Sequence, residues 1–199
     1  MTLKLITDAA TEPISLSEAR LFLKIDSDAT DEDDLITDMI QTARENCEHE
    51  LGGQSLLLQT WEVVLDAFPA AEIELGMPSV TPIGSQAAIE SITYIDTNGD
   101  SQTLSSSLYT IDADSPPGWV LPAVDTTWPA TMDCANAVRV RYTMGSALAS
   151  SLPKSIKSWM LLRIRTLYEF RKEFVCGTVV PLPDRFHCGL LDRYRRWVV

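Results

Sequence analysis

The chain has 199 residues, of which 45% are hydrophobic and 22% are charged, a composition typical of folded globular proteins. That length accommodates one domain with appended segments or two small domains, and no apolar run reaches the roughly 20 residues of a membrane-spanning helix. Because the first residues also lack the apolar core of a signal peptide, we expect the protein to stay in the cytoplasm of the cell that makes it, without contacting a membrane.

The net charge of −12 is distributed unevenly along the chain. Residues 1–150 carry 24 acidic and 6 basic side chains, whereas residues 151–199 carry 4 acidic and 10 basic ones. The acidic body disfavours sequence-specific DNA binding, which needs a basic surface. A basic end on an acidic body is typical of an interaction tail, although an acidic surface that serves only solubility would also explain the body.

The first two predicted elements are helices. Ser15 and Glu18 have the spacing of a capping box, which predicts a short helix over Pro13–Arg20. An acidic loop, residues 26–34, leads into a second predicted helix over Asp33–Leu51, which a Gly-Gly pair ends. Its apolar side chains recur with the helical period. They are Ile36, Met39, Ile40, Ala43, Cys47 and Leu51.

From residue 59 onward the apolar period changes from about 3.6 to about 2 residues, which indicates strands. The predicted strands are Gln59–Pro69, Ala88–Ile95, Ser101–Leu104, Leu108–Ile111, Trp119–Leu121 and Ala137–Tyr142. The pair Asn98-Gly99 predicts a hairpin turn. The segment 76–88, rich in Pro, Gly and Ser, is expected to be an exposed loop that contacts another subunit or a downstream protein.

Pro153 begins the last predicted helix, since proline is well placed in a first turn. The predicted fold class is therefore α+β. Residues 1–58 and 151–180 supply N-terminal and C-terminal helices that form a small bundle, and residues 59–150 form a β-rich antiparallel insertion. Residues 181–199 are expected to form an extended C-terminal docking tail.

Motifs for catalysis and for metal or cofactor binding are missing from the sequence. It contains two histidines and no nucleophile elbow, P-loop or dinucleotide-binding glycine pattern. The four cysteines are too widely spaced for a zinc site, and the acidic segments 26–34 and 96–100 lack the glycine and closing carboxylate of a calcium loop. We therefore expect no catalytic residue, no metal and no cofactor. A small cytosolic enzyme or ligand-binding domain is the less favoured alternative.

The candidate binding residues lie in the tail, where arginines and aromatic residues are concentrated. They are Arg185, Phe186, Arg193, Tyr194, Arg195, Arg196 and Trp197. Arg, Tyr and Trp are the residue types most enriched at binding hot spots, and arginine pairs well with carboxylates. Two interpretations are open: the tail folds back onto its own domain, or it docks onto another chain, which is the favoured one.

The ordered set of segments resembles the head–tail connector (adaptor) proteins of tailed bacteriophages. The resemblance rests on Pro13–Arg20, Asp33–Leu35, Gln59–Phe68, Ile89–Gly99, Trp128-Pro129-Ala130, Val138–Tyr142, Pro153–Tyr168 and Leu190–Arg195. The long 76–88 loop and the arginine-rich end depart from the usual family pattern.

The resemblance implies a structural virion protein and not an enzyme. It implies a closed homo-oligomeric ring, a dodecamer, beneath the portal protein, with genomic DNA passing through the ring without specific binding and a stopper or tail protein docking below. It also implies that the tail residues bind the portal. The expected location is the neck of the virion, at the head–tail junction, after assembly in the host cytoplasm. A tail-completion or tail-terminator ring protein is the main alternative.

Overall fold

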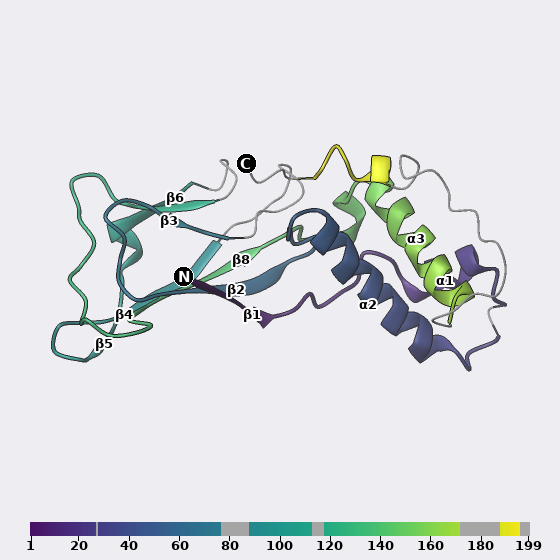
Figure 1. Cartoon of the computed structure of the whole chain (residues 1–199), viewed down its shortest axis with the longest axis horizontal. Coiled ribbons are helices and arrows are strands. Elements are labelled where there is room, and N and C mark those ends of the chain that lie inside the picture. The colour runs from purple at the N-terminus through teal and green to yellow at the C-terminus, as the bar shows by residue number, and fades with distance from the viewer. Residues whose placement is uncertain (27, 77–87, 113–117, 172–187, 196–199) are drawn as a thin grey trace. The chain divides into compact units, whose positions relative to one another are not determined.

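The computed structural model describes residues 1–26, 28–76, 88–112, 118–171 and 188–195, and the chain divides into two compact units. Unit 1 comprises Met1–Ala10 and Leu57–Ala147, and it holds the β-strands (Figure 1). Unit 2 comprises Thr11–Leu56 and Leu148–Val199, and it holds the α-helices. The predicted α+β class is confirmed. Within the described ranges no helix is long and apolar enough to cross a membrane.

Unit 1 is built from two antiparallel sheets. The larger sheet has the strand order β1 (Thr2–Thr7), β2 (Gln59–Leu65), β8 (Val138–Met144), β4 (Ala88–Ile95) and β5 (Ser101–Thr103). The smaller sheet has the order β3 (Ile73–Glu74), β7 (Trp119–Pro122) and β6 (Tyr109–Asp112). The turn at Asn98-Gly99 joins β4 to β5 as predicted, and Gly99 has the positive φ of 90° that this turn requires.

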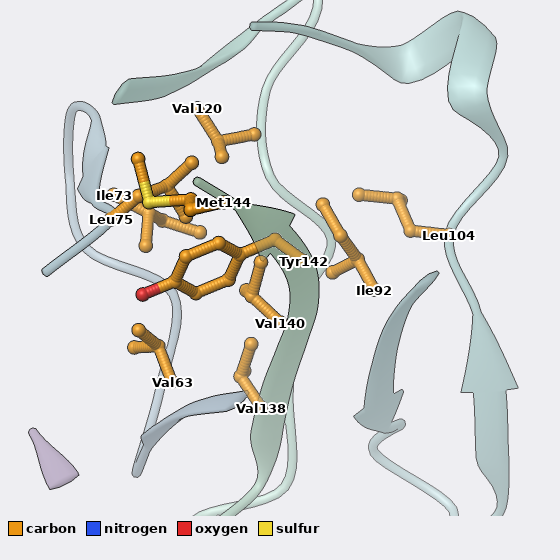
Figure 2. Packing of buried hydrophobic residues seen from close by; sticks show 10 residues of the cluster. All are labelled: Val63, Ile73, Leu75, Ile92, Leu104, Val120, Val138, Val140, Tyr142 and Met144. Carbon is orange, nitrogen blue, oxygen red and sulfur yellow. The ribbon is translucent and has the colours of Figure 1, made fainter. Parts of the chain in front are cut away.

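The core of unit 1 is lined by alternate residues of β8. Val138, Val140, Tyr142 and Met144 are all buried, and Figure 2 shows Val140 and Tyr142 in the middle of the apolar cluster. The smaller sheet contributes Val120 and other buried side chains to the same cluster. Because successive residues of a strand face opposite sides, the intervening arginines of β8 lie on the other face. There Arg139 and Arg141 pair with Glu62 of β2, with N–O distances of 2.9 and 3.1 Å.

Unit 2 contains the predicted helical bundle: α1 (Leu16–Leu23), α2 (Asp33–Glu50) and α3 (Lys154–Glu169) (Figure 1). Ser15 caps α1 by accepting a hydrogen bond from the Glu18 backbone N–H at 3.2 Å. The whole predicted apolar stripe of α2 is buried. In α3, Ile156, Trp159, Met160 and Ile164 are buried as well.

The predicted division of the chain differs from the two units at the N-terminus. The sequence predicts that residues 1–58 belong to the helical bundle, but Thr2–Thr7 form β1 and pair with β2, with Leu3 opposite Val63 and Leu5 opposite Trp61. Leu3 and Leu5 alternate with polar residues, which is the period of a strand. The strand with which they pair lies far along the chain, so the pairing is not visible in the local sequence.

The tail and the predicted contact loop are described only in part. Residues 188–195 form a compact turn that begins with the 3-10 helix η3 (Cys188–Leu190), in place of the extended segment predicted there. Residues 77–87 of the loop lie outside the described residues, so its role as a contact arm stays a prediction.

We expect Gly145→Ala to unfold unit 1 more readily. Gly145 has a φ of 117°, and a Cβ at this position would overlap the backbone carbonyl oxygen of Leu57. Strain of this kind should lower the free energy of unfolding by about 2 kcal/mol or more, as measured by chemical denaturation. The matched control is Gly189→Ala, where a Cβ meets no atom within 4 Å. Equal stability of the two variants would contradict this account.

Candidate binding surfaces of the helical unit

The described residues contain no group of three or more His, Cys, Asp or Glu side chains that could hold a metal ion. Cys47 is buried in α2, and loss of hydration, followed by the nearby Glu48 and Glu50 charges, raises the pKa of its thiol to about 12. A thiol with this pKa stays protonated and unreactive at neutral pH. Cys47 therefore acts as a small apolar residue of the core.

A buried arginine organises the helical unit. The side chain of Arg44, in α2, is 2% exposed, and its Nε donates to Glu12 Oε2 at 3.0 Å while its Nη1 donates to Glu48 Oε2 at 3.1 Å. Glu48 Oε1 in turn accepts the backbone N–H of Leu56 at 2.9 Å. Glu12 precedes α1 and Leu56 follows α2, so this network fixes the chain before and after the helix pair.

Sequence reasoning did not identify Arg44 as a buried residue. Charged residues are almost never fully buried unless they are paired, and Arg44 lies beside an otherwise apolar stripe. The available signal was Glu48, four residues further along the helix, because side chains at this spacing face each other.

We expect Arg44→Met to destabilise the protein strongly. The substitution leaves the carboxylates of Glu12 and Glu48 without their cation in a partly buried site. Loss of one partner of a buried ion pair typically costs about 3–5 kcal/mol, so the denaturant midpoint should fall markedly. Arg165→Met is the control, because Arg165 pairs with Glu169 on the exposed surface of α3 and should cost less than about 1 kcal/mol. A similar midpoint for both variants would show that the Arg44 network is not structural.

A second charged cluster joins the acidic loop before α2 to the end of α3. Tyr168 Oη donates to Glu32 Oε2 at 2.6 Å, and Arg171 donates to both carboxylate oxygens of Glu32, at 2.6 and 3.0 Å. The Arg171 guanidinium carbon also lies 4.3 Å from the centre of the Tyr168 ring. The hydrogen bonds from Arg171 and then Tyr168 lower the pKa of Glu32 from 4.5 to about 2.

This pKa predicts how acid affects the protein. Because the pKa of Glu32 is lower in the folded state, its contribution to stability is complete above pH 4.5 and disappears as the pH falls toward 2. Denaturant unfolding of the wild type and of Glu32→Gln should therefore differ most near neutral pH and converge at about pH 2. A difference in stability that stays constant from pH 6 to pH 2 would contradict the lowered pKa.

The described part of the tail packs onto its own unit. Leu191 is fully buried, and Gln54 Nε2 donates to the Tyr194 backbone oxygen at 2.8 Å. Arg195 pairs with Glu50 at the end of α2, with 2.6 Å between Nη2 and Oε2. For residues 188–195, the structure thus shows the fold-back arrangement that was the less favoured interpretation.

The seven predicted tail residues are only partly brought together. Arg193, Tyr194 and Arg195 lie in the described turn, where Arg193 is exposed and its guanidinium carbon is 6.0 Å from the Tyr194 ring centre. The other predicted tail residues lie outside the described residues, namely Arg185, Phe186, Arg196 and Trp197.

An open cavity of about 340 Å³ lies between α2 and α3, next to the turn. Its lining combines the apolar Trp159 and Leu162 with the charged Arg163 and Arg195. Thr166 also lines it, but its hydroxyl donates to the backbone oxygen of Leu162 at 2.9 Å. Asn46, His49 and Glu50 complete the lining, and the Thr166 hydroxyl is not hydrogen-bonded to either possible base, His49 or Glu50.

Comparison with known proteins agrees with the resemblance found in the sequence. Residues 13–107 match the family model of the phage gp6-like head-tail connector proteins, which confirms that resemblance over this range. No curated protein sequence matches the chain.

Three similar solved structures come from gene transfer agent (GTA) particles. A chain in the neck of the empty GTA particle computed with C6 symmetry has a TM-score of 0.77 and 18% identity. A chain in the virion of the native particle has a TM-score of 0.75 and 18% identity, and one in the native neck computed with C12 symmetry has 0.72 and 16%. Each match covers 100% of this chain and 97% of the other. The whole chain therefore has the fold of these particle proteins.

Proposed function

We propose that this protein is a structural head–tail connector (adaptor) and that it works by assembly, without catalysis. The observation that carries the proposal is the agreement of two comparisons. The sequence of residues 13–107 matches the gp6-like connector family, and the full fold matches chains from GTA necks. The family match covers all of α1 and α2 and the strands from β2 to β5, and the fold match extends to α3 and the tail.

In this role identical copies form a closed ring, a dodecamer, beneath the portal in the neck of the virion. The C6 and C12 symmetry of the similar neck structures supports a cyclic arrangement. The 24 acidic and 6 basic side chains of residues 1–150 suit a ring through which DNA slides, because an acidic surface repels phosphates. A stopper or tail protein docks below the ring, and the free protein occupies the host cytoplasm before assembly.

The tail supplies the contact with the portal in this proposal. Leu191 and Arg195 attach residues 188–195 of the tail to unit 2, which fixes this part of the tail on the subunit. Arg193 is exposed there and available to a partner. The portal-binding set therefore comprises Arg193 and Tyr194 together with Arg185, Phe186, Arg195, Arg196 and Trp197, whose types match those of binding hot spots.

The test is co-purification with the portal protein encoded by the same genome. The full-length chain should co-purify with the portal, and a chain truncated after Arg195 should lose most of this binding while keeping wild-type thermal stability. Leu191→Ala is the comparison: it should lower stability by about 2–5 kcal/mol, because Leu191 is fully buried. A tail-completion or tail-terminator protein would occupy the virion without binding the portal. Failure of the full-length chain to bind would therefore refute the adaptor role, and normal binding by the truncated chain would refute only the role of Arg196 and Trp197.

A further inference from the structure

The exposed face of α2 is acidic, and on it Gln41 Nε2 donates a hydrogen bond to Glu45 Oε1 at 3.0 Å. Asp34, Asp38 and Glu45 are exposed, and they follow one another at helical spacing on the side opposite the buried stripe. None of these three carboxylates forms an ion pair with another described residue. The charge of this face is therefore not neutralised within the described part of the subunit.

The exposed face of α3 carries the opposite charge. Lys154 is exposed and Lys157 half-buried, and neither forms an ion pair among the described residues. Arg165 lies on the same face, where its side chain is 44% exposed and pairs with Glu169. Lys154 and Arg165 lie opposite the buried residues of their own helix, and Lys157 lies at the edge between the basic face and the buried Ile164.

The two faces point away from each other, because α2 and α3 pack together through their apolar stripes. A ring of identical subunits is built from heterologous contacts, in which one patch of each subunit meets a different patch of the next. When the ring has many members, the rotation between neighbours is small, so the two patches must lie on nearly opposite sides of the subunit. The α2 and α3 faces meet this requirement in position and in charge.

We infer that the acidic face of α2 binds the basic face of α3 on a second copy of this chain. This inference rests on the proposed ring and names the surface that closes it. Opposite charges steer the copies together and fix their order, while like charges disfavour α2-to-α2 or α3-to-α3 pairing. Such an interface is weakened by salt, because exposed charges are screened over a few ångströms at about 0.5 M.

The test uses two charge-reversed variants, Asp38→Lys/Glu45→Lys and Lys154→Glu/Lys157→Glu. Each should self-associate at least about tenfold more weakly than the wild type at low salt, as measured by sedimentation and native mass spectrometry. The matched control for Asp38→Lys/Glu45→Lys is Glu72→Lys/Glu74→Lys, which makes the same charge change on exposed residues of unit 1 and should associate like the wild type. Circular dichroism establishes that all three variants are folded.

Mixing the two reversed variants gives the decisive result. Every contact between unlike variants again joins opposite charges, so the mixture should regain association, in complexes that contain equal numbers of the two. The two variants can alternate around a closed ring only if the number of subunits is even, as it is in a dodecamer. The inference is overturned if the mixture associates no better than either variant alone, including the case in which the wild type also stays monomeric.

Portal co-purification separates this inference from the proposed function. If the wild type self-associates and the reversed variants behave as expected, but the wild type does not bind the portal, the adaptor role is refuted and the interface between copies is still supported. Portal binding together with unaltered self-association of the reversed variants would refute the interface alone.

Discussion

The guanidinium of Arg44 lies inside the helical unit and contacts Glu12 and Glu48, and Glu48 also accepts the Leu56 N–H. Removing these charges from water is costly, and the planar guanidinium offsets part of that cost because it serves several acceptors at once. The result is a fixed α2, to which the rest of the unit is attached at both ends. Glu32 joins its start to α3, and Glu50 joins its end to the C-terminal turn.

Features that depend on neighbouring residues could be predicted from the sequence. The Ser15 cap, the apolar stripe of α2 and the Asn98-Gly99 hairpin each follow from a pattern within a few positions, and each is present. Strand β1 was missed because a six-residue segment becomes a strand only when a partner is available, and its partner β2 is separated from it by both N-terminal helices.

The contacts of the C-terminal tail could not be predicted either, because they join residues that are far apart in the sequence. The basic and aromatic character of the tail was apparent, but its attachment was not, since the buried Leu191 has no apolar periodicity around it and Glu50 lies 145 positions before Arg195. Charge by itself also says little about which residues pair. Arg44 and Arg165 are both helical arginines with a glutamate four residues away, yet the first is buried and the second is exposed.

The chain alternates between its two units, and this order determines which unit is complete first during synthesis. The chain starts in unit 1, passes through α1 and α2, returns to unit 1 and ends in unit 2. Translation proceeds from the N-terminus, so β8 completes the larger sheet while α2 still lacks α3. The part of the apolar stripe of α2 that α3 covers is then exposed on every chain that ends before α3, and the α3 surface does not yet exist. A prematurely terminated product is thus recognisable to chaperones and proteases by its uncovered helix, and it has only one of the two faces through which we propose that copies bind.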